Sequence, residues 1–210
     1  MSAAVSARAI NATVRDATWA DAVPASETLA RAFLDDPLIG HFMPDADRRK
    51  AKLPRVFRVL LKLGLPYRAC HVTSGCEAVA FWRPPKQWHL SIWDYVKNGP
   101  ELLVAFGGDA LRVMSAMDFI EKRHPKEPHW YLQTIGTDPE KQGKGFASLI
   151  MRHQLAVADA DRLPCYLESS KDTNVPIYQS FGFRLTGEIP IPNGGPTIWP
   201  MWREPANVKI

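Results

Sequence analysis

The stretch Thr137–Met151, TDPEKQGKGFASLIM, joins a strand pattern to a helix pattern through a glycine-containing loop. The preceding residues 129–135, HWYLQTI, are aromatic and β-branched, which is the composition of a strand. Apolar residues at helical spacing follow the loop. The start of a helix exposes N–H groups without intrahelical partners and carries partial positive charge, so this order of elements builds an anion site. Gly143 and Gly145 let the backbone approach a phosphate closely, and Lys144 adds a positive charge beside it.

The spacing of the loop distinguishes it from two other phosphate-binding motifs. A P-loop requires Ser or Thr after its Gly-Lys pair, whereas Gly145 follows Lys144 here. A dinucleotide fingerprint would have to use Gly143, Gly145 and Ala147, which closes that motif one residue early. A glycine-rich turn that binds no ligand is the alternative to an anion site.

The order Gln142, Gly145, Ala147 resembles the acyl-CoA loop of the GNAT family of N-acetyltransferases, in which such residues surround the pyrophosphate. Residues 174–183, NVPIYQSFGF, are similar to the family's Asn-x-x-x-Tyr-x-x-x-Gly-Phe segment. The whole segment 129–205 further resembles the branch that contains puromycin N-acetyltransferase. The resemblance therefore covers the C-terminal half well and the N-terminal half through short pieces only.

The resemblance implies a mixed α/β (α+β) protein with the GNAT acyl-CoA N-acyltransferase fold, as a single domain over residues 1–210. A central mixed, twisted sheet flanked by helices is expected, with one splayed pair of parallel strands. The pattern agrees, because a helix crosses between the strand at 129–135 and a strand at Pro164–Ser169, which makes the two parallel. In the family a bulge at Ile135-Gly136-Thr137 splays the pair, and the freed backbone groups bind the pantetheine arm.

The resemblance also implies which residues bind acetyl-CoA as co-substrate. They belong to the end of a strand, the loop, the following helix and a short helix near the C-terminus: Ile135, Gly136, Thr137, Gln142, Gly143, Lys144, Gly145, Phe146, Ala147, Asn174 and Tyr178. The backbone N–H of Ile135 is the expected oxyanion donor. No metal is expected, because the six histidines are scattered and no Cys/His/Asp cluster has ligand spacing.

The implied chemistry is direct attack of a primary amine on the thioester in a ternary complex. Holding both reactants in line supplies on the order of 7–11 kcal/mol. Tyr178 is expected to protonate the leaving thiolate, since a phenol with an ordinary pKa of about 10 keeps its proton at neutral pH; a packing role is the alternative.

Glu168 is the expected base, acting directly, through water or by holding the acceptor ammonium; a strand-end carboxylate paired with Lys or Arg is the alternative. His41, His89 and His129 are weaker candidates.

Composition bounds the class of protein. A chain of 210 residues with a net charge of +4 and a hydrophobic fraction of 46% suits one compact domain. A nucleic-acid partner is not expected, because no basic block is longer than Arg48-Arg49-Lys50. Three cysteines do not make a secreted disulfide framework, and no apolar run reaches membrane-spanning length. The expectation is a cytoplasmic monomer or homodimer without a membrane partner, with an Ala/Ser-rich transit peptide as the alternative at the N-terminus.

The rest of the chain gives a coarse order of elements. Helices are predicted over 19–33, 45–64 and 174–181, strands over 12–17, 67–73 and 76–82, and a closing hairpin over 183–189 and 197–203. Residues 1–10 are expected to be a flexible lead-in. The apolar segment 38–44 is either a packed connection or the floor of a substrate cleft. Residues 84–128 form a helical insertion that either packs in the core or covers the acceptor site as a lid.

Neither the fold nor the cofactor-binding loop determines which molecule accepts the acetyl group. The expected acceptor is the amine of a small molecule, apolar or xenobiotic in character. A protein N-terminus or lysine is the alternative within the enzyme class. A CoA-binding sensor or scaffold without turnover is the alternative outside it.

Overall fold

The computed structural model describes residues 12–88, 99–101, 104 and 106–206. The expected lead-in at 1–10, the candidate base His89 and the centre of the 84–128 insertion lie outside the described residues. The helices are α1 Ala22–Ala32, α2 Pro37–Phe42, α3 Ala46–Gly64, α5 Ala110–Glu121, α6 Phe146–Ala160 and α7 Val175–Gln179. The strands are β1 Val14–Asp16, β2 Cys70–Thr73, β3 Ala78–Arg83, β4 Trp130–Thr137, β5 Cys165–Ser169, β6 Arg184–Leu185, β7 Ile189–Pro190 and β8 Thr197–Arg203.

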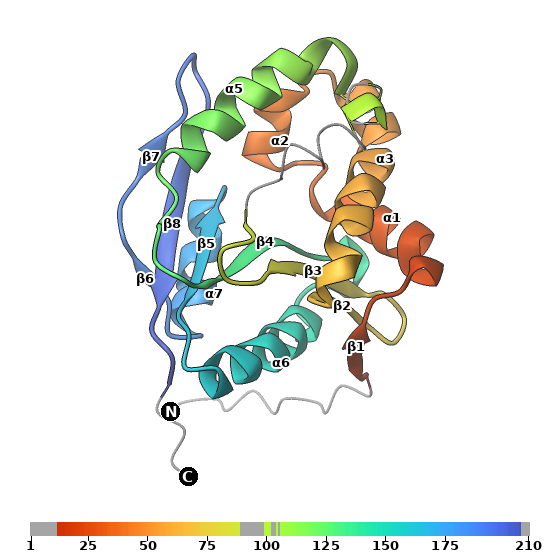
Figure 1. Ribbon diagram of the computed structural model, residues 1–210. Helices are drawn as coiled ribbons and strands as arrows, with labels where there is room; N and C mark the ends of the chain where they lie inside the picture. The colour runs from red at the N-terminus through yellow and green to blue at the C-terminus, as the bar shows by residue number, and fades with distance from the viewer. Residues whose placement is uncertain (1–11, 89–98, 102–103, 105, 207–210) are drawn as a thin grey trace, which may run out of the picture.

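The strands form a mixed sheet in the order β1-β2-β3-β4-β5-β8-β6, with β7 also paired to β8 (Figure 1). β4 and β5 are parallel, and the other neighbouring strands in the described residues are antiparallel. The parallel pairing covers only Trp130–Leu132 against Cys165–Leu167. Beyond it, β4 continues along β3 while β5 continues along β8. The predicted mixed sheet with a splayed parallel pair is therefore confirmed.

The bulge that accompanies this splay lies earlier in β4 than predicted. Phe81 faces Thr134, but the next residue of β3, Trp82, faces Leu132, so Gln133 is the extra residue. The expectation of a bulge at 135–137 is wrong, because these three residues pair regularly with β3. The register shift falls directly after Leu132, where the parallel pairing with β5 ends. Beyond Leu132 the two parallel strands diverge and leave a gap between β4 and β5. Residues 135–137 border this gap and keep a regular strand conformation.

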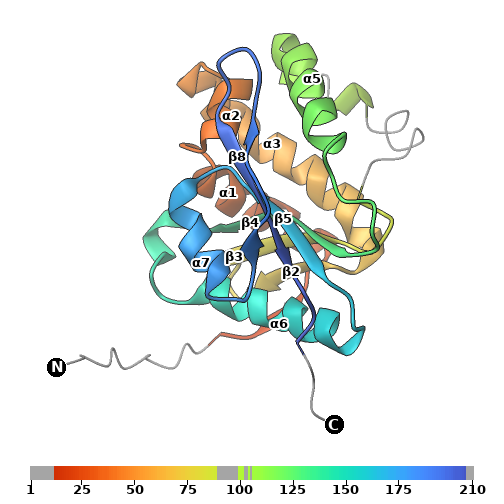
Figure 2. The ribbon, with the colours of Figure 1, turned by 90° about the vertical axis from the view of Figure 1, so that its left-hand side faces the viewer.

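Helices cover both faces of the sheet, with α6 on one side and α1 and α3 on the other (Figures 1 and 2). The side chains of β3 alternate between the two resulting cores. Val79 and Phe81 belong to the core with α1 and α3, while Ala80 and Trp82 belong to the core with α6. A strand buried on both faces reads as a continuous apolar run, which explains the sequence AVAFW.

The apolar segment after α1 forms a short helix, α2, that was not predicted. The Asp36 carboxylate accepts hydrogen bonds from the N–H groups of Leu38 at 3.0 Å and Ile39 at 3.1 Å, and Pro37 occupies the first helical turn. Asp followed by Pro ends one helix and equally starts the next as N-cap and first residue.

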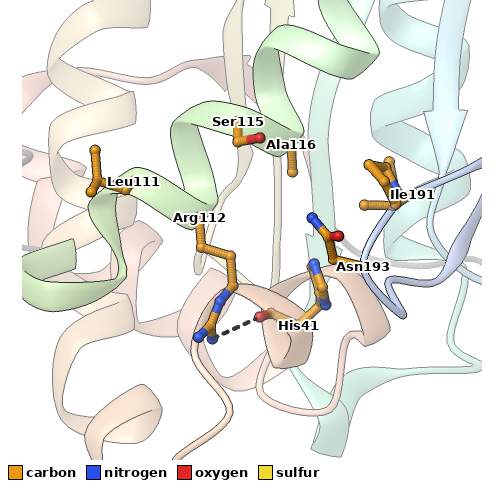
Figure 3. A pocket seen from close by; sticks show the side chains of 8 residues that line it. His41, Leu111, Arg112, Ser115, Ala116, Ile191 and Asn193 are labelled. Carbon is orange, nitrogen blue, oxygen red and sulfur yellow. Dashed lines mark hydrogen bonds between the residues drawn. The ribbon is translucent and has the colours of Figure 1, made fainter.

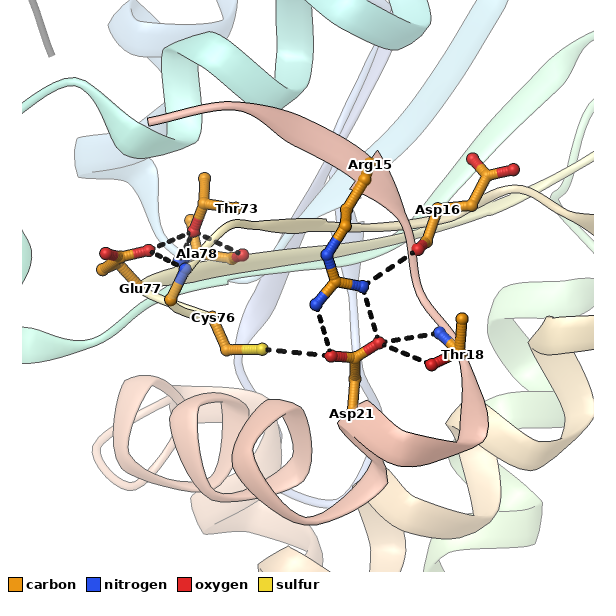
Figure 4. A network of polar contacts seen from close by, with 9 residues as sticks. Arg15, Asp16, Thr18, Asp21, Thr73, Cys76, Glu77 and Ala78 are labelled. Carbon is orange, nitrogen blue, oxygen red and sulfur yellow. Dashed lines mark hydrogen bonds and ion pairs between the residues drawn. The ribbon is translucent and has the colours of Figure 1, made fainter. Parts of the chain in front are cut away.

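A polar network fixes β1 against the start of α1 (Figure 4). The buried Asp21 carboxylate accepts two hydrogen bonds from the Arg15 guanidinium, at 2.8 and 2.6 Å, and one from the Thr18 N–H at 2.8 Å. The hydrogen-bonded Arg15 guanidinium holds the pKa of Asp21 well below its usual range. The network therefore stabilises the fold only while Asp21 is ionised.

We expect Asp21→Asn to lower the free energy of unfolding by about 2 kcal/mol near pH 7. Charged hydrogen bonds contribute about 1.5–3 kcal/mol each, discounted here because Arg15 is 44% exposed. A depressed folded-state pKa gives stability that is present above the unfolded value of about 3.9 and lost as the pH falls through the folded value. In urea titrations the difference between wild type and variant should shrink from pH 7 to pH 3.

The matched control is Asp118→Asn, which removes an exposed ion pair to Lys122. Such surface pairs contribute about 0–1 kcal/mol, so this variant should unfold almost as wild type does. An Asp21→Asn difference that is the same at both pH values would contradict the assignment of a stabilising charge to Asp21.

Candidate functional site

A cleft with a volume of about 650 Å³ opens where β4 and β5 diverge. Its walls come from the end of α1, the second half of β4, the loop before α6, the end of β5 and α7. Most residues that the sequence assigns to the site line it: Ile135, Gly136, Thr137, Gln142, Gly143, Gly145, Phe146, Ala147, Glu168, Asn174 and Tyr178. The fold thus brings loop, strand gap and α7 around one space.

The two loop glycines have backbone conformations that other residues rarely adopt. Their φ angles are +73° at Gly143 and +87° at Gly145. The Gln142 side-chain amide donates to the Thr137 carbonyl at 3.3 Å and closes the loop. Within the described part of the chain, the N–H groups of Gly143, Lys144 and Gly145 have no hydrogen-bond partner, and α6 begins without a side-chain cap. These free donors at a helix start fit a diphosphate.

Lys144 does not line the cleft, so its predicted place beside the phosphate stays a prediction. Its ammonium donates to the Glu140 carbonyl at 3.0 Å and is thereby held on its own turn. The exposed Lys141 lines the cleft instead. The glycine spacing carries no information about which of two loop lysines faces the ligand, so sequence reasoning missed Lys141.

Gly136 is required by packing as well as by its place at the cleft. A Cβ on Gly136 would lie 2.9 Å from the Ala32 Cβ and 2.9 Å from the Leu29 Cδ2. The absence of a side chain therefore lets α1 lie directly on β4, beside the gap.

We expect Gly136→Ala to lower the free energy of unfolding by about 1–3 kcal/mol, because the added methyl group overpacks the contact between α1 and β4. Chemical denaturation measures this change. Gly187→Ala is the control, since a Cβ there meets no atom within 4 Å. Equal stability of the Gly136→Ala variant and wild type would contradict the close approach of α1.

Tyr178 lies on α7 and is half-buried at the edge of the cleft. Burial, and after it the Asp36 carboxylate, raises the pKa of Tyr178 to about 12. The phenol therefore keeps its proton at neutral pH and can donate it. No side chain among the described residues hydrogen-bonds its hydroxyl group, which leaves that group available to a ligand.

Asp36 is a site residue that sequence reasoning missed. Its buried side chain lines the cleft, and one carboxylate oxygen accepts a short hydrogen bond from the Ser170 hydroxyl while the other caps α2. The sequence signal was the Asp-Pro pair, which indicates a helix boundary and says nothing about a cleft.

Glu168 lies on β5, and its side chain is 7% exposed. Its partner is His124, whose Nδ1 lies 3.2 Å from the Glu168 Oε1, so the alternative of pairing with Lys or Arg is wrong. The His124 Nε2 in turn lies 2.9 Å from the His129 Nε2. His129, one of the weaker candidates for the base, reaches the partner of Glu168 with its ring. His124 was not predicted, because nothing in its local sequence indicates that it reaches β5.

A second cavity of about 330 Å³ lies between α2, α5 and the turn that joins β7 to β8 (Figure 3). His41, Arg112 and Asn193 contribute polar groups to it, and the Arg112 guanidinium donates to the His41 carbonyl at 3.4 Å. The candidate base His41 thus lines this cavity and not the cleft. Among the described residues of the 84–128 insertion, those of α5 line this second cavity.

Comparison with known families decides the identity. The family described as acetyltransferase (GNAT) domain matches residues 95–204, which is more than half of the chain. The chain belongs to the GNAT acetyltransferase family. It is an acetyl-transferring enzyme, and GNAT acetyltransferases use acetyl-CoA as co-substrate.

Relatives agree with this assignment. An uncharacterized N-acetyltransferase of Schizosaccharomyces pombe is 25% identical over 171 residues, which cover 76% of this chain and 69% of the relative. A Corynebacterium glutamicum structure described as histone acetyltransferase HPA2 and related acetyltransferase is 29% identical, with a TM-score of 0.71 over 96% of this chain and 100% of the other.

Two solved structures share the fold at lower identity. One is a Drosophila melanogaster polyamine N-acetyltransferase that forms N-acetylagmatine, 15% identical with a TM-score of 0.59 over 92% of this chain and 100% of the other. The other is arylalkylamine N-acetyltransferase 2 of Aedes aegypti, 11% identical with a TM-score of 0.61 over 94% and 100%. They support the GNAT fold over more than nine tenths of the chain.

The described residues of this GNAT enzyme contain no group of three or more His, Cys, Asp or Glu side chains arranged to hold a metal ion. Among the same residues, no helix is both long enough and apolar enough to cross a bilayer. Cys70, Cys76 and Cys165 are buried free thiols.

Proposed function

We propose that this GNAT enzyme transfers the acetyl group of acetyl-CoA to the primary amine of a small molecule within a ternary complex. One observation carries the proposal: a single cleft runs from the free loop N–H groups, through the gap between β4 and β5, to Glu168 and Tyr178. This arrangement supports a reaction in which both substrates are bound at once and no covalent intermediate forms with the protein.

The donor set of the cleft supports acetyl-CoA as the first substrate. The N–H groups from Gly143 to Ala147 suit the diphosphate, and Lys141 adds positive charge. The segment Ile135–Thr137 borders the gap, where a pantetheine arm can lie alongside a strand edge. The Ile135 N–H is the proposed donor to the oxyanion. Asn174 lines the same cleft from the turn before α7.

In the proposed reaction two side chains transfer the protons, one as base and the other as acid. The acceptor ammonium loses one proton to Glu168, and the free amine attacks the thioester carbon. As the carbon–sulfur bond breaks, Tyr178 donates its proton to the thiolate, and the second proton from nitrogen restores the phenol. The net products are the amide, the free thiol of CoA and one proton released to water.

The charge of the cleft supports an amine as acceptor. The carboxylates of Asp36 and Glu168 both line it, and they suit an ammonium group. Polyamine and arylalkylamine acetyltransferases share the fold. The sequence of the C-terminal segment resembles the branch that contains puromycin N-acetyltransferase. A small, drug-like amine in the cytoplasm is thus the proposed acceptor; the three buried free thiols are in keeping with that compartment. A peptide amine is the second candidate, favoured by the Corynebacterium glutamicum relative.

Thiol release from acetyl-CoA across a panel of amines tests the proposal. The panel contains agmatine, a polyamine, an arylalkylamine, an aminonucleoside and a lysine peptide. We expect saturable release with at least one small amine and little with the peptide. Release with the peptide alone would favour the second candidate. Binding of CoA without release for any amine would overturn the proposal in favour of a sensor.

A further inference from the structure

Three buried side chains behind the cleft form a hydrogen-bonded chain. The proposed acetyl transfer uses only one of them, Glu168. The chain runs from Glu168 through His124 to His129 and ends at the Glu127 carbonyl, 2.6 Å from the His129 Nδ1. The side chain of His124 is 3% exposed. Each contact is short enough to require a proton between its two atoms.

The last contact determines where the protons lie. A carbonyl oxygen only accepts, so the His129 Nδ1 must carry hydrogen. The Nε2 of a neutral His129 then accepts, and the His124 Nε2 must be the donor across their 2.9 Å contact. A neutral His124 therefore presents the lone pair of its Nδ1 to the Glu168 carboxylate at 3.2 Å. Two acceptors face each other there.

The other tautomer of His124 only moves this conflict. With hydrogen on Nδ1, His124 donates to Glu168, but its bare Nε2 then faces the bare Nε2 of His129 at 2.9 Å. One additional proton satisfies all three contacts at once, whether it resides on Glu168, on His124 or on His129. All three contacts are therefore hydrogen bonds only when the cluster holds one extra proton.

We propose that Glu168, His124 and His129 act as one proton acceptor that takes up a single shared proton from the acceptor ammonium. The inference rests on the proposed function and deepens it by assigning two positioning residues to the base. In the step, an N–H bond of the ammonium breaks, its electron pair stays on nitrogen, and the proton binds Glu168. Its arrival turns the contact between two acceptors into a hydrogen bond, which favours the protonated cluster. The proton leaves to water after acetyl transfer.

The surroundings favour a proton on the Glu168 side of the cluster. The indole of Trp88 stacks on the His124 ring with centroids 3.9 Å apart, an arrangement that stabilises a cation. Burial lowers the pKa of His129, which disfavours a second proton on that ring. Burial and then the Glu168 carboxylate raise the pKa values of Tyr131 and Tyr166, so neither phenol competes as a base. The other charged groups that face the cluster among the described residues are Arg83 and Glu127.

Nitrogen NMR of the histidine rings in the full chain without substrates tests the shared proton directly. In a titration between pH 5 and pH 9 we expect His124 to gain its second N–H in one step, with hydrogen on Nδ1 of His129 throughout. The Glu168→Gln variant should lack that step, because the Gln amide donates to the His124 Nδ1 and satisfies it without a charge. Identical His124 titrations in wild type and variant would overturn the proposal.

The pH profile of kcat/KM is the second measurement. His124→Gln should lower kcat/KM at least about tenfold and move the acidic limb to lower pH, while the Kd of CoA stays unchanged. His153→Gln, at an exposed histidine of α6, is the control and should change neither. An acidic limb that stays in place in His124→Gln would overturn the inference even if kcat/KM falls. If no amine is acetylated, the proposed function fails, and the NMR titration still decides whether the proton is shared.

Discussion

The Tyr178→Phe variant is expected to lose about 10²–10⁴-fold of kcat, the range that a positioned general acid contributes. The substitution removes one hydroxyl group and keeps the ring that packs against Phe183, with centroids 6.2 Å apart. A raised pKa means that the wild-type phenol is protonated when the thiolate leaves, whereas Phe has no proton to give. The Kd of CoA should stay within about twofold, because the diphosphate contacts lie in the loop before α6. Steady-state kinetics and calorimetry measure the two quantities.

Tyr67→Phe is the matched control for this variant. Tyr67 is also half-buried, and its ring lies 5.0 Å from the Arg83 guanidinium carbon, a contact that Phe retains. This variant should turn over as wild type does. A Tyr178→Phe enzyme with an unchanged kcat would exclude Tyr178 as the acid and leave it as a side chain that packs α7 on the sheet.

Gly143→Val should raise the Kd of CoA about 10²-fold, which corresponds to a loss of about 3 kcal/mol. A Cβ at Gly143 meets no protein atom within 4 Å, because the position faces open space at the cleft. The side chain would therefore stand where the diphosphate binds. A β-branched residue also resists a φ of +73°, so the loop would shift its N–H groups away from the anion. Calorimetry with CoA measures the effect.

Gly194→Val separates the two causes. Gly194 has a φ of +76° and equally open surroundings, but it lies in the turn between β7 and β8. The two variants should lose similar amounts of stability, about 1–3 kcal/mol for a strained residue. Only Gly143→Val should lose affinity for CoA. Equal affinities in the two variants would contradict a diphosphate site at the loop.

Local sequence patterns predicted the fold well where the structure of an element depends mainly on its own residues. The β-branched strand, the glycine loop and the apolar helix appear at β4, the loop and α6, and the crossover helix made β4 and β5 parallel. The predicted long last hairpin is instead two short strands, β6 and β7, on β8. The predicted start of β2 at Tyr67 is also wrong, because Arg68 has a φ of +51° and ends a 3-10 turn there.

The parts of the site that escaped prediction depend on contacts between distant segments. His124 meets Glu168 across 44 positions of sequence, and Ser170 meets Asp36 across 134. No periodicity or motif encodes such a meeting, because it arises only when the sheet has been assembled. The position of the bulge at Gln133 is of the same kind, since it depends on the register between β3 and β4. The different positions of Lys141, which lines the cleft, and Lys144, which does not, likewise arise only when the loop has folded.

A crystal structure of the protein with bound CoA tests the central claim most directly. We predict diphosphate oxygens within hydrogen-bond distance of N–H groups between Gly143 and Ala147. The pantetheine arm should lie in the gap between β4 and β5, beside Ile135–Thr137, with its sulfur near the Tyr178 hydroxyl. CoA bound between α2 and α5, or β4 and β5 paired along their whole length with the cofactor outside, would contradict the account.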